Sequence, residues 1–180
     1  KNNRWKAYVL DRKRGRYKTG GDFMKQAKLT ADSRTEQVQI VLPQHANSAK
    51  RLFGGMLMEW IDVVAAVVAR RHANSEVTTA CIDNLQFRAA VVINSTVVLI
   101  GKMTYVGRTS MEVRVDTFVE HLDGQRELVN TAYMVFVALD EHQRPVAVPK
   151  LLVQNEQERY EFESGARRQQ LRKERRHQGY

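Results

Sequence analysis

An acidic residue in the middle of an apolar segment is the first feature that could do chemistry. Residues 54–72 carry apolar side chains at most positions, yet Asp62 stands near their centre. Burying an unpartnered carboxylate is costly, so Asp62 is expected either to be held by hydrogen-bond donors or to act on another molecule. In the second case it would serve as a general base or as a nucleophile. The sequence alone leaves both possibilities open.

Two consecutive glycines, Gly54 and Gly55, stand at the start of the same segment, and Asn47 precedes them in a polar loop. The first N–H groups of a helix lack partners within the helix and carry partial positive charge. At a glycine no side chain covers them, so they could stabilise an oxyanion. The alternative is that the glycines only allow a helix to pack closely on a sheet. Asn47, as a loop residue, is expected to be a turn or cap residue unless another observation gives it a further role.

The elements that must position these residues follow from the sequence pattern. Residues 54–72 contain no proline and many good helix formers, with apolar side chains on nearly every face, which predicts a buried central helix. The valines in this stretch favour a strand, but the stretch is longer than a normal strand. Strand patterns precede and follow it, at residues 35–42, 77–82, 85–87, 96–106, 110–120 and 131–139. This order predicts an α+β fold in which a curved antiparallel sheet wraps around the helix.

Three regions are expected along the chain: a basic N-terminal arm at 1–34, one folded domain at 35–153, and a charged C-terminal tail at 154–180. The tail is predicted to be an exposed helix interrupted near Gly165, with its basic residues forming an ordinary charged face: Arg167, Arg168, Arg172 and Lys173. In residues 110–120 apolar and charged side chains alternate, so one face of that strand is expected to contact water. Asp123-Gly124 predicts the hairpin turn that follows it.

Composition limits the class of protein. The chain has 180 residues, of which 43% are hydrophobic, which suits one domain with appendages. Cys81 is the single cysteine, which excludes an internal disulfide framework and a zinc site of several thiolates, and favours a reducing cytoplasm. His45 and His72 show no metal-ligand spacing, so no metal is expected. The longest apolar stretch, residues 56–69, is too short to cross a bilayer. The formal charge of +9 favours an anionic partner: nucleic acid, a membrane surface, or a small phosphorylated ligand.

Four stretches in order resemble the acyl-CoA hydrolases of the hot-dog superfamily. Residues 47–62 read N-S-A-K-R-L-F-G-G-M-L-M-E-W-I-D, and residues 77–87 read V-T-T-A-C-I-D-N-L-Q-F. Residues 106–113 read V-G-R-T-S-M-E-V, and residues 136–140 read F-V-A-L-D, followed by P-V-A-V-P. The resemblance spans roughly residues 35–155 and extends to the charged tail.

The resemblance implies a hot-dog fold and hydrolysis of acyl-CoA to a carboxylic acid and CoA, without a cofactor. It implies a catalytic role for Asp62 as general base or nucleophile, with Asn47 and the Gly54-Gly55 backbone polarising the thioester carbonyl. Phe53 stands where some relatives have His, which favours hydrolysis over dehydration. Residues 92–95 occupy a turn where relatives often carry Gly, although Asn94 can adopt the same conformation.

The spacing within the helix adds a constraint. Asp62 lies seven residues after Gly55, or roughly 10 Å along a helix axis, so both can hardly contact one carbonyl group from the same helix. A twofold pair of antiparallel helices would bring Asp62 of one subunit beside Asn47 and Gly55 of the other. The expected assembly is therefore at least a homodimer. The resemblance implies a further step to a trimer of dimers, that is, a hexamer.

The phosphates of CoA require basic and hydroxyl groups near the site. Arg108, Thr109 and Ser110, at a junction between two strands, are the first candidates, and Arg88 is a second. The alternative for the first three is an ordinary hairpin turn with a solvated arginine.

Two other functions fit parts of the sequence. A nucleic-acid-binding module would use the basic ends, but the chain lacks the interleaved aromatic and basic residues that stack bases. An acyl-CoA-binding protein without catalysis would use the same fold and pocket, and the sequence does not separate it from an enzyme.

Overall fold

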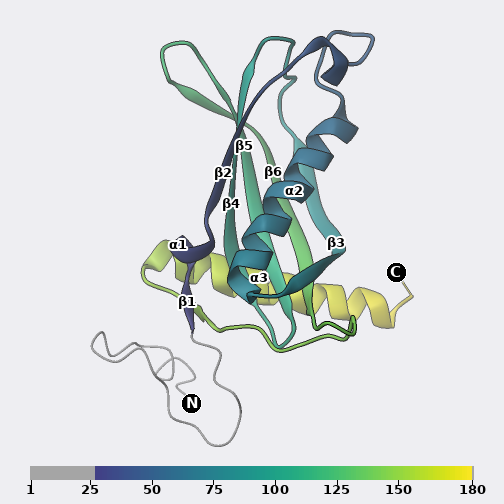
Figure 1. Ribbon diagram of the computed structural model, residues 1–180, viewed down its shortest axis with the longest axis vertical. Helices are drawn as coiled ribbons and strands as arrows, with labels where there is room; N and C mark the ends of the chain where they lie inside the picture. Colours follow the sequence, from purple (N-terminus) through teal and green to yellow (C-terminus); the bar gives the residue numbers. More distant parts are fainter. Residues whose placement is uncertain (1–26, 180) are drawn as a thin grey trace, which may run out of the picture.

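A five-stranded antiparallel sheet and one long helix form the centre of the fold, which the computed structural model describes for residues 27–179 (Figure 1). The strands lie in the order β2-β4-β5-β6-β3, and every neighbouring pair is antiparallel. Their bounds are Thr35–Ile40 (β2), Glu76–Phe87 (β3), Thr96–Val106 (β4), Ser110–Glu120 (β5) and Arg126–Leu139 (β6). The helix α2 (Gly54–Ala73) covers one face, called here the inner face. This is the predicted α+β hot-dog arrangement.

Helix α2 packs closely on the inner face at Gly101 of β4. A Cβ atom at this position would lie 2.8 Å from Cγ1 of Val64 and 2.9 Å from Cγ2 of Val68. Both valines and Ile61 are fully buried between the helix and the sheet. Each such aliphatic side chain stabilises the fold by roughly 1.5–3 kcal/mol through burial. The missing side chain at position 101 therefore allows this contact.

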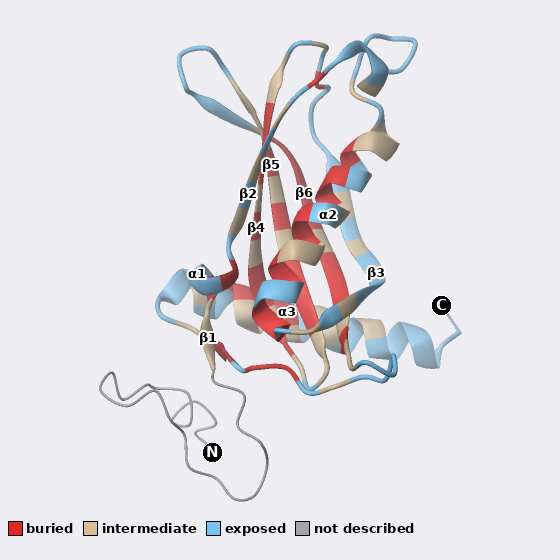
Figure 2. Ribbon diagram, viewed as in Figure 1, coloured by how far each residue is buried: buried red, intermediate tan, exposed pale blue. Residues whose placement is uncertain are grey.

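The opposite face of α2 is open within one chain (Figure 2). Met58 is 40% exposed and Val63 is 48% exposed, and Asp62 is half-buried between them. The expectation that apolar residues on nearly every face would make the helix wholly buried is wrong for the single chain. The physical reason is that one chain supplies one sheet, which covers one side of the helix.

Strand β3 lies at the edge of the sheet and pairs with β6 alone among the described strands. The sequence predicted two strands here, and the structure has one strand of 12 residues. Its pairing is interrupted twice, between Thr79 and Cys81 and between Ile82 and Asn84, where one residue of β3 has no partner on β6. Such bulges keep a strand continuous but change which face the following side chains occupy.

The outer face of the sheet is crossed by the C-terminal helix α3 (Glu156–His177), which lies behind the sheet in Figure 1. The predicted interruption near Gly165 is wrong. Gly165 lies inside the continuous helix, where an added Cβ would be 2.5 Å from Cβ of Tyr105, so its missing side chain allows close packing on β4. The expectation of a wet face on β5 is also wrong, because α3 covers it and leaves Glu112 only 1% exposed.

The remaining elements are short. The strand β1 (Lys28–Leu29) pairs in parallel with β7 (Leu151–Leu152), and the one-turn helix α1 (Thr30–Ser33) follows β1. A 3-10 turn, η2 (Pro43–His45), precedes the loop to α2. Most of the predicted basic arm, residues 1–26, lies outside the described residues. Neither of the two long helices in residues 27–179 has an apolar stretch of the length that a bilayer core requires.

His72, at the C-terminal end of α2, is fully buried beneath the segment that leads to β7. Its Nε2 lies 3.0 Å from the carbonyl oxygen of Pro149, which can only accept, so Nε2 carries the proton of the neutral ring. Burial lowers the pKa of His72 below its ordinary value, and the bond to Pro149 offsets only part of this effect.

Stability is therefore expected to depend on pH through His72. The unfolded chain binds a proton at this residue more readily than the folded chain, so the free energy of unfolding should fall as the pH drops below about 6.5. The change His72→Gln keeps an N–H group for Pro149 but cannot titrate. Urea unfolding near neutral pH and near pH 5 should show a steeper loss for the wild type than for the variant. Equal slopes would show that His72 contributes nothing to this dependence.

Candidate functional site

Asp62 is held by a hydroxyl group from the sheet. It lies at the middle of α2, and the Oγ1 of Thr79 donates a hydrogen bond of 2.9 Å to its Oδ1. Thr79 is paired with Phe136 on β6, a core residue of the inner face, so its side chain points toward α2. The second carboxylate oxygen, Oδ2, has no protein donor within residues 27–179. Asp62 thus has both a holding partner and an oxygen available to another molecule.

Asn47 organises the loop before α2. Its Oδ1 accepts hydrogen bonds from the backbone N–H groups of Ala49 at 3.0 Å and of Arg51 at 3.2 Å. Its backbone bonds to the same turn, through Arg51 and Lys50. Because the amide oxygen is used by the turn, the amide NH₂ group is the end of this side chain that can donate to a bound molecule. The expected role of Asn47 as a turn residue is confirmed. The turn uses only the amide oxygen of this side chain, so the NH₂ group could have a second role.

The first backbone N–H groups of α2 lie near two aromatic rings, those of Phe53 and Phe87. Phe53 precedes the helix and provides no side-chain cap, and the first helical bond runs from the N–H of Leu57 to the carbonyl of Phe53. For the N–H groups of residues 54–56 no acceptor is recorded in the described part of the chain. A Cβ at Gly55 would lie 2.5 Å from the ring of Phe53, and one at Gly54 would lie 3.4 Å from the ring of Phe87. Both rings are more than half exposed.

The candidates for binding phosphate lie at two ends of the sheet. Arg88 follows β3 next to Phe87, at the Gly54 end, where its backbone N–H bonds to Val129. The β4–β5 turn with Arg108, Thr109 and Ser110 lies at the opposite end. Met111, the next residue, is in the same row of the sheet as Thr79, since both pair with Phe136. Two strand spacings separate them, or roughly 10 Å.

Within the turn, the backbone is fixed and the arginine side chain is exposed. The carbonyl of Arg108 accepts from the N–H of Val148, and that of Thr109 accepts from Ala138. The Ser110 hydroxyl lies 3.5 Å from Nε2 of Gln169 on α3. Among residues 27–179 Arg108 forms hydrogen bonds through its backbone alone, so its exposed guanidinium group is available to a ligand.

Within one chain the candidate residues therefore fall into two separate groups, called here candidate half-sites. The first contains Asn47, Gly54, Gly55 and Arg88, and the second contains Asp62 with its Thr79 partner and the turn at residues 108–110. Helix rise places Gly55 and Asp62 roughly 10 Å apart along α2. Thr79 was not singled out from the sequence. The sequence pattern predicts strands at residues 77–82 and 85–87, but only the folded structure brings Thr79 against Asp62.

Other reactive side chains do not gather into a site. In the described residues, no three His, Cys, Asp or Glu side chains come together in a way that could hold a metal ion. His45 accepts a hydrogen bond from the backbone of Leu42 and lies edge-on to Trp60. Cys81 is a half-buried free thiol, and burial raises its pKa above the ordinary value. Such a thiol is a weak nucleophile at neutral pH.

Comparison with known proteins gives consistent matches. Residues 49–123 match the Thioesterase superfamily. The chain is 39% identical over 137 residues to the uncharacterized acyl-CoA thioester hydrolase YkhA of Bacillus subtilis, covering 76% of each protein. An acyl-CoA hydrolase from Staphylococcus aureus, solved in complex with butyryl coenzyme A, coenzyme A and coenzyme A disulfide, superposes with a TM-score of 0.81 at 30% identity over 85% of this chain and 94% of that one. A hexameric acyl-CoA thioesterase superposes with a TM-score of 0.80 at 38% identity over 84% of this chain and 97% of that one.

Three further structures of the S. aureus hydrolase carry single replacements by alanine, of an asparagine, an aspartate and a threonine. The replaced positions are separated by 15 and by 17 residues. In the present chain Asn47, Asp62 and Thr79 are separated by the same 15 and 17 residues.

Proposed function

The chain belongs to the acyl-CoA thioester hydrolases of the thioesterase superfamily, and we propose that it hydrolyses acyl-CoA at composite sites that each combine the two half-sites of different subunits. Asp62 of one subunit acts as the general base, or as the nucleophile. Asn47 and the Gly54-Gly55 backbone of the other subunit polarise the thioester carbonyl. The reaction requires no metal and no cofactor beyond the CoA of the substrate. The proposed location is the cytoplasm, which suits the free thiol of Cys81.

The observation that carries this proposal is the hydrogen bond from Thr79 to Asp62. It fixes a half-buried carboxylate on the open face of α2 through one oxygen and leaves the other oxygen available. A carboxylate held in this way can accept a proton from a water molecule in a defined position. The matching 15- and 17-residue spacings of Asn, Asp and Thr in the S. aureus hydrolase support the same three residues.

In the proposed reaction a water oxygen attacks the thioester carbonyl carbon while Asp62 takes one proton from that water. The negative charge that develops on the carbonyl oxygen is stabilised by the amide of Asn47 and by the N–H groups at the start of α2. The carbon–sulfur bond then breaks, and the proton passes to the sulfur of the departing CoA. If Asp62 attacks the carbonyl directly, the intermediate is a mixed anhydride that water hydrolyses in a second step.

Two open surfaces support pairing of two chains. The outer side of α2 exposes Met58 and Val63, and the edge strand β3 exposes Ile82 and Phe87. An uncovered strand edge offers a row of backbone donors and acceptors to another strand. A twofold pairing through these surfaces would cover both, and the hexameric neighbour indicates that further assembly is compatible with the fold.

The same pairing would join the two half-sites. If two α2 helices lie antiparallel, the Gly54 end of each helix meets the middle of its partner. Asn47 and Arg88 of one chain would then approach Asp62 and Arg108 of the partner subunit. The exposed guanidinium groups of Arg88 and Arg108 would meet at the same ligand, with Thr109 and Ser110 beside them, and could bind the phosphates of CoA.

Loss of the Asp62 carboxylate is expected to lower turnover of acyl-CoA by at least about a hundredfold in Asp62→Asn, since general-base catalysis typically contributes 10²–10⁴-fold. Free thiol release, measured with purified protein, gives kcat. A second variant, Asn47→Asp, keeps an oxygen for the loop turn but replaces the NH₂ donor with a negatively charged carboxylate oxygen, and should cost at least about tenfold to a thousandfold. Near-normal turnover in a folded Asp62→Asn protein would contradict the assignment.

Arg108→Ala tests the binding of the anionic end of the substrate. Because the turn is held by backbone bonds, the variant should fold normally. The KM for acyl-CoA should rise by about tenfold, as expected for the loss of one charged contact to phosphate. A short thioester without a nucleotide serves as the control and should be hydrolysed at an unchanged rate. Equal losses on both substrates would indicate a folding role instead.

Mixing two inactive variants tests the shared site. Asn47→Asp and Asp62→Asn are combined under conditions in which subunits exchange, and mixed dimers are verified by native mass spectrometry. In a mixed dimer one site receives both defects and the other receives neither, so activity should return toward half that of a wild-type dimer. If each site were built within one chain, every site would stay defective, and the absence of recovery would overturn the composite arrangement.

A further inference from the structure

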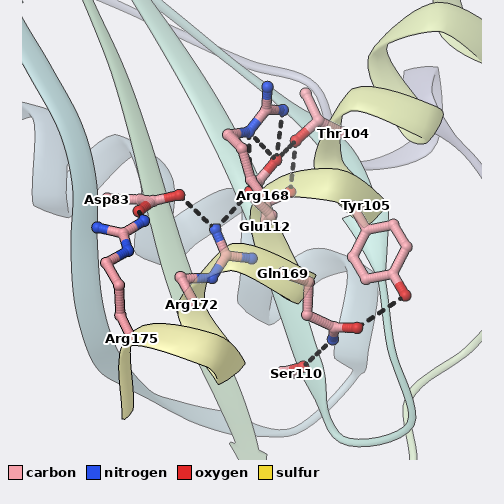
Figure 3. Close-up of polar contacts among 9 residues, drawn as sticks. All are labelled: Asp83, Thr104, Tyr105, Ser110, Glu112, Arg168, Gln169, Arg172 and Arg175. Atoms are coloured by element: carbon pink, nitrogen blue, oxygen red, sulfur yellow. Dashed lines mark hydrogen bonds and ion pairs between the residues drawn. The ribbon is translucent and has the colours of Figure 1, made fainter. Parts of the chain in front are cut away.

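A buried cluster of charged residues fastens α3 to the sheet (Figure 3). Its centre is Glu112 on β5, whose side chain is fully buried. Arg168 donates to it through Nη2 at 2.7 Å, Arg172 donates through Nη1 at 2.9 Å, and the Thr104 hydroxyl donates at 2.8 Å. Burial opposes the charge on Arg168, but its hydrogen bonds to Glu112 and the nearby negative charge outweigh this effect and raise its pKa.

The cluster extends to the edge strand β3 through Asp83, whose side chain is 5% exposed. The Nη1 of Arg172 donates to Asp83 at 2.6 Å as well as to Glu112, and Nη2 of Arg175 donates to Asp83 at 3.0 Å. Arg172 therefore bridges β5 and β3, which are separated by β6 in the sheet. We refer to Asp83, Glu112, Arg168, Arg172 and Arg175 as the α3 clamp.

The α3 clamp contacts β3 in the segment where the pairing of β3 with β6 is interrupted. Ala80 and Asp83 are the two β3 residues without partners on β6. Regular alternation would place Thr79 and Asp83 on the same face, since they are four residues apart. The extra residue at Ala80 reverses the alternation, so that Thr79 faces α2 while Asp83 faces α3. A segment with two bulges has fewer ladder bonds to hold it, and the clamp supplies a second support from the outer face.

The two ends of the segment 79–83 therefore contact different helices. Thr79, just before the first bulge, donates to Asp62 on α2, and Asp83, at the second bulge, is held by α3. We propose that Arg172 is a positioning residue for the hydrolysis. By holding Asp83 against the outer face, it fixes the bulged segment 79–83 and thereby the hydroxyl group that orients Asp62. This inference rests on the proposed function of Asp62.

The chain offers a matched control in Arg168. It lies one turn away on the same helix and binds the same buried Glu112, and its guanidinium carbon lies 3.9 Å from the ring centroid of Tyr133. Its recorded contacts in the described residues are thus with β5 and β6, whereas Arg172 reaches β3. A purely structural clamp would make both arginines equivalent for catalysis.

The experiment compares Arg172→Gln, Asp83→Asn and Arg168→Gln in the full chain. Arg172→Gln and Asp83→Asn are expected to lower kcat by about tenfold at nearly constant KM, since a small displacement of a catalytic group is costly. Arg168→Gln should lower the melting temperature but keep kcat within about twofold. In a Thr79→Val background, where the hydroxyl is already absent, Arg172→Gln should have no further effect on kcat. If Arg172→Gln does not fold, Asp83→Asn tests that contact from the strand, together with the contact that Arg175 makes with Asp83.

A second measurement does not depend on activity. Hydrogen exchange of a peptide covering residues 78–83 should become faster in Arg172→Gln and stay unchanged in Arg168→Gln. Unchanged exchange or an unchanged kcat in Arg172→Gln would overturn the positioning role. Equal losses of kcat in Arg172→Gln and Arg168→Gln would also overturn it, as would a full additional loss of kcat from Arg172→Gln in the Thr79→Val background. Failure of the proposed function has a different signature, which is normal turnover in Asp62→Asn. In that case the positioning role fails with it, and the exchange measurement reports only whether Arg172 holds the segment 79–83.

Discussion

The close contact between α2 and the sheet at Gly101 determines which side of the helix is buried and which side faces outward. With no side chain at position 101, Val64 and Val68 pack directly on β4, and the helix lies along the inner face. A helix buried on one side in this way presents its other side outward. Asp62 lies on that outward side, close enough to β3 for Thr79 to reach it. The packing of the core thus decides that the carboxylate lies on the outward side of α2, beside β3.

Helix length then separates the parts of the site. The N–H groups at Gly54-Gly55 exist only at the beginning of α2, because every later N–H group bonds within the helix. The Asp62–Thr79 contact exists only where β3 passes beside the helix. Because these places are roughly 10 Å apart along one axis, a single chain does not bring them to one atom. The exposed apolar residues along α2 and β3 offer a physical reason for pairing with a second chain, which in the proposed arrangement completes each site.

The outer face of the sheet contacts its helix through a different kind of interaction from the inner face. There the contact with α3 is made by charges rather than by aliphatic packing, and Glu112 is satisfied by two arginines and a hydroxyl. A buried ion pair contributes little net stability compared with a hydrophobic contact, but losing one partner is costly. Such a network therefore favours one specific position of α3. That specificity links the outer helix to the edge strand, and through Thr79 to the carboxylate on the inner side.

The sequence by itself determined the central helix, the β4, β5 and β6 strands and the family, because these depend on local periodicity and on motifs contiguous along the chain. It did not determine the role of Thr79, the single bulged strand β3, or the burial of Glu112 beneath a continuous α3. The alternation in β5 predicts a charged face, but the sequence pattern is the same whether water or arginine side chains contact that face. Arg172 meets Asp83 across 89 residues of chain, and only the tertiary structure brings such distant charges together.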